Sequence, residues 1–143
     1  MKASTPWLTI LVCVSVVASA MAAGTGPAGG KLRPCPGSPN CVRSEMPDRD
    51  VQPLAVSSRG EWEGLIRTIV AMGGSVEHVE DGYVHATFRS RVFGFVDDLE
   101  CRRDGDVVQV RSASRSGWWD LGVNRRRVER LRAALADEAG QGR

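Results

Sequence analysis

Residues 93–127 read FGFVDDLECRRDGDVVQVRSASRSGWWDLGVNRRR, and this stretch decides the fold. At its centre the pair Asp104-Gly105 stands between two runs rich in apolar and β-branched residues. An Asp-Gly pair in that setting is the strongest short-range signal for a two-residue hairpin turn. The stretch therefore predicts two antiparallel strands, in which Leu99 faces Val110 and Asp97 faces Ser112.

The two strands divide their side chains between two faces, because successive residues of a strand point in opposite directions. We expect the apolar face to be the core side, and it holds Phe95, Leu99, Cys101, Val108 and Val110. The other face is expected in solvent and holds Asp98, Glu100, Arg102, Gln109 and Arg111. In this register Arg111 is opposite Asp98 and can form a cross-strand ion pair. Asp97 and Asp98 point to opposite faces, which excludes a paired-carboxylate catalytic site.

A second pair, Asp81-Gly82, predicts another hairpin over residues 75–88. There His78 faces His85, and these are the only two histidines of the chain. The pair is a weak candidate for a metal site or a pH sensor, because imidazole binds transition metals and titrates near neutrality. With no third ligand in view, two exposed sheet residues are the simpler interpretation. Val76 falls on the histidine face, and the core face holds Val79, Val84, Ala86 and Phe88.

Two helices are predicted around the hairpins. The segment from Ser58 to Glu61 is a capping box and begins a helix that runs to about Met72. Its apolar positions have the spacing of one helix face: Trp62, Leu65, Ile66, Ile69 and Met72. The last helix is expected to begin at an Asn124 cap and to end near Ala139.

These elements predict an α+β fold in the order β-α-β-β-β-β-α. The first strand lies within residues 48–56, at an edge, because an edge strand tolerates Pro53. The other four strands form an antiparallel meander, and both helices cover its apolar face. Phe93, in the link between the hairpins, is expected to fold inward. The order is similar to TATA-binding-like or helix-grip architectures, an analogy that carries no function.

The motifs CPGSPNC, FGFVDDLE, VRSASR and DLGVNRRR follow one another in this chain from Cys35 to Arg127. In this combination the sequence resembles domain-of-unknown-function family 1499, whose members are bacterial and plastid proteins. The resemblance covers residues 32–135. It implies an exported domain with no established activity, substrate or cofactor.

The N-terminus has the pattern of a signal peptide. Lys2 precedes an apolar run from Trp7 to Ala18, and Ala20-Met21-Ala22 is a small-residue cleavage site. We expect residues 1–22 to be removed on export, residues 23–31 to be a flexible linker, residues 32–139 to form one domain, and residues 140–143 to be a tail. An uncleaved membrane anchor is the alternative, although the apolar run is shorter than the ~20 residues of a spanning helix.

Export also bears on the cysteines and the charge. Two prolines and a glycine between Cys35 and Cys41 bring the chain back on itself, and we expect these cysteines to form a disulfide in an oxidising compartment. The full chain has 19 basic and 17 acidic residues; removal of Lys2 with the leader leaves 18 against 17. A nearly neutral exported protein is not expected to bind nucleic acid.

A cluster of polar residues is expected at one end of the sheet, beside the start of the last helix. Arg125, Arg126 and Arg127 occupy a helix start, where the macrodipole disfavours cations. Either acids compensate them in a structural network, which we favour, or an external anion binds there. The network acids are Asp97, Asp98 and Asp120; the candidate anion-binding residues are Arg111, Ser112, Ser114, Arg115, Asn124 and Arg125.

No catalytic signature supports an enzyme. The chain has no GxSxG, HExxH, P-loop or dinucleotide motif. We therefore expect a monomeric, non-catalytic binding or structural module of the cell envelope, without a cofactor, that recognises an anionic envelope component or a small anion. The alternative is a hydrolase-type or metal-dependent enzyme that uses Asp97, Arg115 and Ser112, or the pair His78 and His85.

Overall fold

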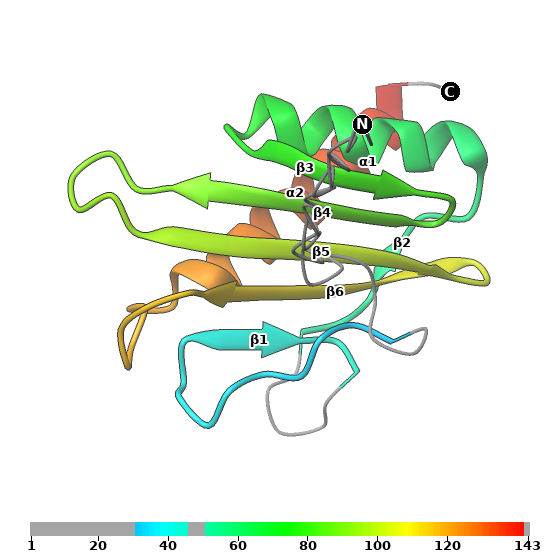
Figure 1. Cartoon of the computed structure of the whole chain (residues 1–143). Coiled ribbons are helices and arrows are strands. Elements are labelled where there is room, and N and C mark those ends of the chain that lie inside the picture. Colours follow the sequence, from blue (N-terminus) through cyan, green and yellow to red (C-terminus); the bar gives the residue numbers. More distant parts are fainter. Residues whose placement is uncertain (1–30, 46–50, 142–143) are drawn as a thin grey trace, which may run out of the picture.

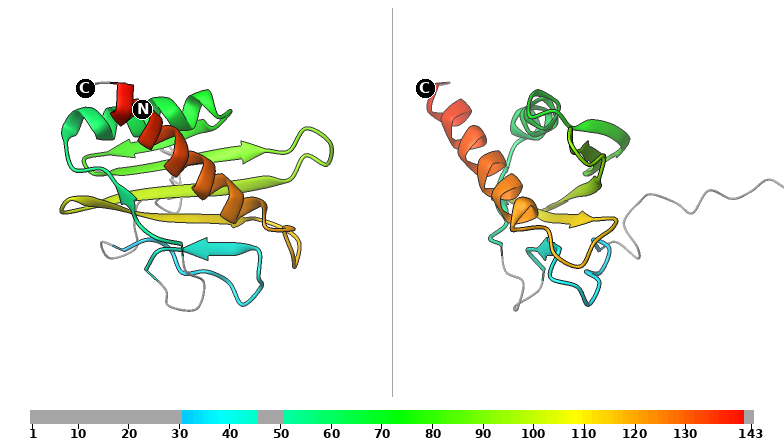
Figure 2. Two further views of the ribbon diagram at one scale, coloured as in Figure 1. Left: turned by 180° about the vertical axis from the view of Figure 1, so that it is seen from behind. Right: turned by 90° about the vertical axis from the view of Figure 1, so that its left-hand side faces the viewer.

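A computed structural model describes residues 31–45 and 51–141 of the chain. The fold is α+β: an open antiparallel sheet carries two helices on one face (Figures 1 and 2). The strand order is β1-β6-β5-β4-β3, and β2 also pairs with β6. The predicted class, with its antiparallel meander and one-sided helices, is confirmed. The elements are β1 (Cys41–Arg43), β2 (Leu54–Ala55), α1 (Arg59–Ala71), β3 (Ser75–Glu80), β4 (Tyr83–Arg89), β5 (Val96–Asp104), β6 (Val107–Ser114) and α2 (Val123–Gln141).

The central hairpin, β5–β6, turns at Gly105 and Asp106, one residue later than predicted. Leu99 faces Ser112 and Asp97 faces Ser114, so the predicted register is wrong by two residues. The turn explains the difference: Gly105 has a φ of 62°, while Asp106 does not have a positive φ, and a two-residue turn with glycine first is of type II′. A slip of two leaves each side chain on its predicted face.

The β3–β4 hairpin has the predicted register near its turn, where His78 faces His85. A bulge between Val76 and His78 then changes the alternation of β3. Val76 packs against the core as a result, and its assignment to the histidine face is wrong. Val79, which was predicted for the core, is half exposed because β3 is an edge strand with a neighbour on one side only.

Helix α1 begins where the capping box predicts. The Ser58 hydroxyl accepts from the amide of Glu61, and the Glu61 carboxylate accepts from the amides of Ser58 and Ser57. These backbone hydrogen bonds lower the pKa of Glu61 to about 2. The helix ends before Gly73, whose φ of 91° is typical of a residue that follows a helix.

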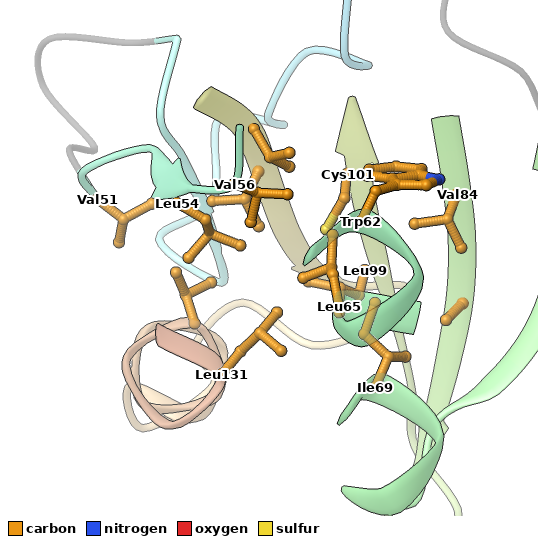
Figure 3. Packing of buried hydrophobic residues seen from close by; sticks show 14 of the residues in the cluster. Val51, Leu54, Val56, Trp62, Leu65, Ile69, Val84, Leu99, Cys101 and Leu131 are labelled. Carbon is orange, nitrogen blue, oxygen red and sulfur yellow. The ribbon is translucent and has the colours of Figure 1, made fainter. Parts of the chain in front are cut away.

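The hydrophobic core lies between the sheet and the two helices (Figure 3). Trp62, Leu65 and Ile69 of α1 are buried in it, as is Leu131 of α2. Cys101 is fully buried on the same face, and burial together with the nearby charge of Glu100 raises the pKa of its thiol. Cys101 is therefore a packing residue and not a reactive thiol.

Helix α2 begins one residue before the predicted cap. Asn124 lies within its first turn and is fully buried, so its assignment as the N-cap is wrong. Asp120 caps the start of the helix instead: its carboxylate accepts hydrogen bonds from the amides of Gly122 and Asn124, at 3.0 and 2.8 Å. A short acidic side chain just before a helix compensates both the unpaired amides and the macrodipole.

The edge of β6 is covered by two short strands rather than one. The predicted strand at residues 48–56 is represented by β2 within residues 51–56, and residues 48–50 lie outside the described chain. The sequence did not predict β1, which pairs with residues 111–113 of β6. The expected signal peptide and most of the expected linker also lie outside the described residues. No helix within residues 31–45 and 51–141 is long and apolar enough to cross a bilayer.

The helix-free face of the sheet departs most from prediction. Expected in solvent, it instead buries Asp98, Glu100 and Arg111, with Glu100 0% exposed. Residues 31–40, which we call the N-terminal strap, account for this, because Leu32 is buried and Arg33 reaches the Glu100 carboxylate. Buried charges require partners, and these partners define the polar sites of the domain.

Candidate functional site

A first polar network lies on the helix side, where β5 and β6 meet the start of α2. Arg127 donates to the Asp97 carboxylate at 2.6 Å, to the Asn124 side-chain oxygen at 2.7 Å and to the Ser112 hydroxyl at 2.9 Å. Its guanidinium also lies 4.6 Å from the centre of the Phe88 ring. All of these groups are buried. Arg127 is thus neutralised by Asp97, although it belongs to the first turns of a helix.

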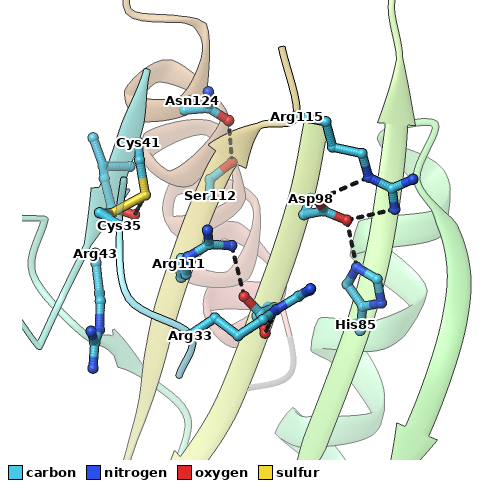
Figure 4. Close-up of polar contacts among 12 residues, drawn as sticks. Arg33, Cys35, Cys41, Arg43, His85, Asp98, Arg111, Ser112, Arg115 and Asn124 are labelled. Atoms are coloured by element: carbon cyan, nitrogen blue, oxygen red, sulfur yellow. Dashed lines mark hydrogen bonds and ion pairs between the residues drawn. A yellow bond between two sulfur atoms is a disulfide. The ribbon is translucent and has the colours of Figure 1, made fainter. Parts of the chain in front are cut away.

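Asn124 joins this network to the N-terminal strap. Its amide nitrogen donates to the Ser114 hydroxyl and to the Asn40 backbone oxygen, both at 3.0 Å, and to the Asp120 carboxylate at 2.8 Å. Its oxygen accepts from the Ser112 hydroxyl at 2.6 Å (Figure 4). Asn124 therefore uses both ends of its amide to hold the strap, the sheet and the helix together.

A second network lies on the helix-free face and centres on Glu100. Its carboxylate accepts from Arg111 and Arg33 at 2.8 Å each, and from the Tyr83 hydroxyl at 2.9 Å. Burial and the charge of Glu100 raise the pKa of Tyr83. Burial lowers the pKa of Arg111, and Glu100 opposes this effect. Figure 4 shows Arg33 and Arg111 meeting over the sheet.

Beside Glu100, Asp98 joins His85 to Arg115. His85 Nε2 lies 2.7 Å from the Asp98 carboxylate, and Arg115 makes two hydrogen bonds to it at 2.8 and 3.0 Å. Burial acts to raise the pKa of Asp98, but the bonds from His85 and Arg115 outweigh it and hold the pKa well below its usual range. Asp98 is therefore a carboxylate at neutral pH.

The disulfide between Cys35 and Cys41 closes the strap. It is formed as the sequence predicts. Because Cys41 lies in β1 and pairs with Ala113 of β6, the bridge ties residues 35–40 to the sheet. It thereby holds the preceding residues, including Arg33, over the helix-free face.

The family model for proteins of unknown function termed DUF1499 matches residues 31–135. The chain belongs to this family. No curated protein matches the chain in sequence. The match spans the strap, the sheet, α1 and most of α2, so both polar networks lie within the DUF1499 domain.

The structure divides the polar residues that were predicted to converge beside the last helix: those on the helix side do lie together at the start of α2, and Arg111 and Arg115 do not join them. In this DUF1499 domain they separate by face, because β5 and β6 point alternate side chains to opposite sides. The helix side holds Asp97, Ser112, Ser114, Asp120 and Asn124, and the helix-free side holds Asp98, Arg111 and Arg115. The predicted ion pair of Arg111 with Asp98 is not formed, because Arg111 pairs with Glu100 and Asp98 pairs with Arg115. The amides at the start of α2 are already occupied by Asp120.

Several residues of these networks were not predicted as site residues. Arg33, Asn40 and Arg127 bond to groups up to 84 residues away, and such non-local contacts leave no periodic pattern in the sequence. Glu100 was placed on the correct face and was missed because that face was assigned to solvent. Arg127 had a signal, since three consecutive arginines at a helix start require acidic partners.

The two histidines have separate partners. His78 Nε2 lies 2.6 Å from Glu80, on the partly exposed edge strand. His85 is 2% exposed, and its Nδ1 has no hydrogen-bond partner among residues 31–45 and 51–141. Asp98 and His85 resemble two members of a hydrolytic triad, but no described hydroxyl or thiol bonds to Nδ1. Across the same residues, no cluster of three or more histidine, cysteine or acidic side chains is arranged to hold a metal.

The surface at one end of the sheet differs from the rest of the domain. Residues 89–95, from the last residue of β4 to the residue before β5, and residues 116–126, the loop before α2 with the first residues of that helix, lie at this same end of the sheet (Figure 1). We call these two segments the loop end. The amide of Arg115 donates to the oxygen of Val96 at 2.9 Å and links the two segments. Phe93, which was predicted to fold inward, is 74% exposed here. Phe95 was assigned to the core face and is also exposed, because it precedes β5 and lies beyond the helices' cover.

Proposed function

We propose that this DUF1499 chain is an exported, monomeric, non-catalytic binding module of the cell envelope, and that it binds an anionic envelope component through the loop end. The observation that carries the proposal is the concentration of positive charge there. Four exposed arginines, Arg89, Arg91, Arg125 and Arg126, stand against one acid, Asp120. The loop end therefore has a formal charge of +3, while the whole chain has +2, which leaves −1 for all other residues.

The single acid of the loop end does not cancel this charge in the way a surface carboxylate would. Asp120 is half-buried and accepts hydrogen bonds from the backbone amides of Gly122 and Asn124 and from the Asn124 side chain. Two of the arginines are held in place by loop carbonyls: Arg89 donates to Gly94 at 3.2 Å, and Arg126 donates to Leu121 at 2.8 Å. Positive side chains clustered on an otherwise neutral protein favour an anionic partner.

The proposed site replaces the anion site inferred from the sequence. Of those six residues, Arg111, Ser112, Ser114, Arg115 and Asn124 belong to the networks on the two faces of the sheet. Arg125 alone belongs to the loop end. It lines a shallow hollow of about 290 Å³ together with Trp119 and Asp120. The enzyme alternative is disfavoured, because Asp97 and Ser112 lie on one face of the sheet and Arg115 lies on the other.

Retention on an immobilised phosphate polymer tests this proposal. We expect the wild-type chain to elute from phosphocellulose at higher salt than the double variant Arg91→Gln/Arg125→Gln, since each arginine near an anionic surface contributes roughly a fivefold increase in binding. The matched control, Arg59→Gln/Arg130→Gln, removes the same charge from exposed positions on α1 and α2. Equal elution of the two variants would contradict binding through the loop end.

A further inference from the structure

The loop end exposes large apolar side chains as well as arginines. The described residues include eight large apolar side chains that are exposed, and six of them lie in these two segments; the two others are Val70 and Val79. The six, with their exposed fractions, are Val92 (81%), Phe93 (74%), Phe95 (52%), Trp118 (72%), Trp119 (66%) and Leu121 (63%). A contiguous exposed apolar patch rimmed by polar residues marks an interaction surface.

These side chains come from two loops at the same end of the sheet. The Phe93 and Phe95 rings stack with their centres 5.7 Å apart, and the hydrogen bond from the Arg115 amide to the Val96 oxygen joins the chain where the two loops meet the sheet. Both loops project beyond the ends of the strands, away from the hairpin turns at the opposite end of the sheet (Figures 1 and 2). The exposed apolar side chains are therefore presented at one end of the molecule.

The backbone adds a second, independent observation. Leu121 has a φ of 55° and is the only residue other than glycine with a positive φ among residues 31–45 and 51–141. That conformation favours glycine or asparagine and is strained for a bulky side chain. An exposed leucine contributes little to folding in return, and strained residues of this kind cluster at functional sites.

The chemistry of the patch distinguishes between possible partners. Two tryptophans and two phenylalanines beside arginines match the interface of a bilayer, where aromatic rings lie at the headgroup level and arginines contact anionic lipids. A second copy of the chain would bring its own +3 charge to the contact and would be repelled. We propose that the anionic component is a lipid bilayer surface, and that the loop end inserts its aromatic and aliphatic side chains among the headgroups. This inference rests on the proposed function and names its partner.

Quenching of tryptophan fluorescence by brominated lipid tests insertion directly. The full chain is used with Trp7→Phe, so that Trp118 and Trp119 are the only tryptophans besides the buried Trp62. Vesicles contain dibrominated phosphatidylcholine, either alone or in an equal mixture with phosphatidylglycerol. Because the readout is local to the loop end, it reports insertion whether or not residues 1–22 also hold the chain on the vesicle.

We expect strong quenching with phosphatidylglycerol, little with phosphatidylcholine alone, and a loss of quenching at high salt. Arg91→Gln/Arg125→Gln should weaken the apparent vesicle affinity by roughly 25-fold, at about fivefold for each arginine, while Arg59→Gln/Arg130→Gln should leave it unchanged. Trp118→Ser/Trp119→Ser removes exposed side chains only, so it should fold normally. Because it also lacks the fluorescent reporters, its loss of insertion is measured as reduced co-sedimentation with phosphatidylglycerol vesicles.

The remaining outcomes separate this inference from the proposed function. Retention on phosphocellulose without quenching would overturn the bilayer as partner and leave anionic binding in place. The absence of both retention and quenching would overturn both the anionic binding and the insertion into a bilayer. Equal quenching in neutral vesicles would exclude recognition of anionic lipid. A concentration-dependent dimer that Trp118→Ser/Trp119→Ser dissolves would identify a second copy as the occupant and overturn the inference.

Discussion

Asp97 and Asp98 are neighbours in the sequence and serve two different networks. Arg127 reaches Asp97 from α2, while His85 and Arg115 hold Asp98 on the opposite face. Each carboxylate is buried and has a cationic partner. A buried ion pair contributes little net stability, but the loss of one partner leaves an uncompensated charge. The role of each pair is therefore measured best by a substitution that removes one of its two partners.

Replacement of Arg127 should reveal this asymmetry. We expect Arg127→Met to lower the free energy of unfolding by roughly 3 to 5 kcal/mol, because Asp97 is left buried and unpaired. Asp97→Asn added to Arg127→Met should restore a large part of that loss, since the orphaned charge is removed. Urea denaturation of the four members of the cycle measures both effects. Additive losses in the double variant would show that the two side chains do not interact.

Asp98 predicts a dependence of stability on pH. Its pKa is held below the ordinary value of about 3.9 by His85 and Arg115. A depressed pKa in the folded state contributes stability that is complete above the unfolded pKa and is lost as pH falls toward the folded pKa. We expect the wild-type melting temperature to fall more steeply below about pH 4 than that of Asp98→Asn. Parallel curves for the two proteins would contradict this assignment.

At the scale of elements, the strap controls whether the helix-free face is covered. Its disulfide closes a short loop, with a sequence separation of 6, so the entropy it removes from the unfolded chain is small. We expect Cys35→Ser/Cys41→Ser to lower the free energy of unfolding by about 2 kcal/mol, as measured in urea. Native Cys101 should resist alkylation throughout, because it is fully buried. Rapid labelling of Cys101 in the variant would show that the core, and not only the strap, has opened.

Local sequence signals predicted the helices and strands well, whereas contacts between residues far apart in the sequence could not be predicted. The capping box at Ser58 and the Asp81-Gly82 turn each depend on neighbouring residues, and both form as predicted. The side-chain faces of β5 also follow from the sequence alone. What covers those faces does not: Arg33 lies 67 residues from Glu100. The sequence therefore identified the polar residues of the site but not the two networks that they form.

For the molecule as a whole, the two ends of the sheet differ in character. The loop end has exposed aromatic residues and a formal charge of +3, and the opposite end consists of the two hairpin turns at residues 81–82 and 105–106 (Figure 1). The networks on both faces of β5 make the sheet a rigid support between these ends, because each joins two or more elements through buried hydrogen bonds. A rigid domain that binds through the loop end alone is expected to bind a surface in a single orientation.

Hydrogen exchange on vesicles tests that orientation. If the loop end inserts, amides in residues 89–95 and 116–122 should exchange more slowly with phosphatidylglycerol vesicles, since these loop amides become shielded from water. The hairpin turns should keep their rates, because they face away from the bilayer. Trp118→Ser/Trp119→Ser should show no slowing at either end, and phosphatidylcholine vesicles serve as the neutral control. Slower exchange at residues 81–82 or 105–106 with no change at the loop end would show that the opposite end contacts the lipid.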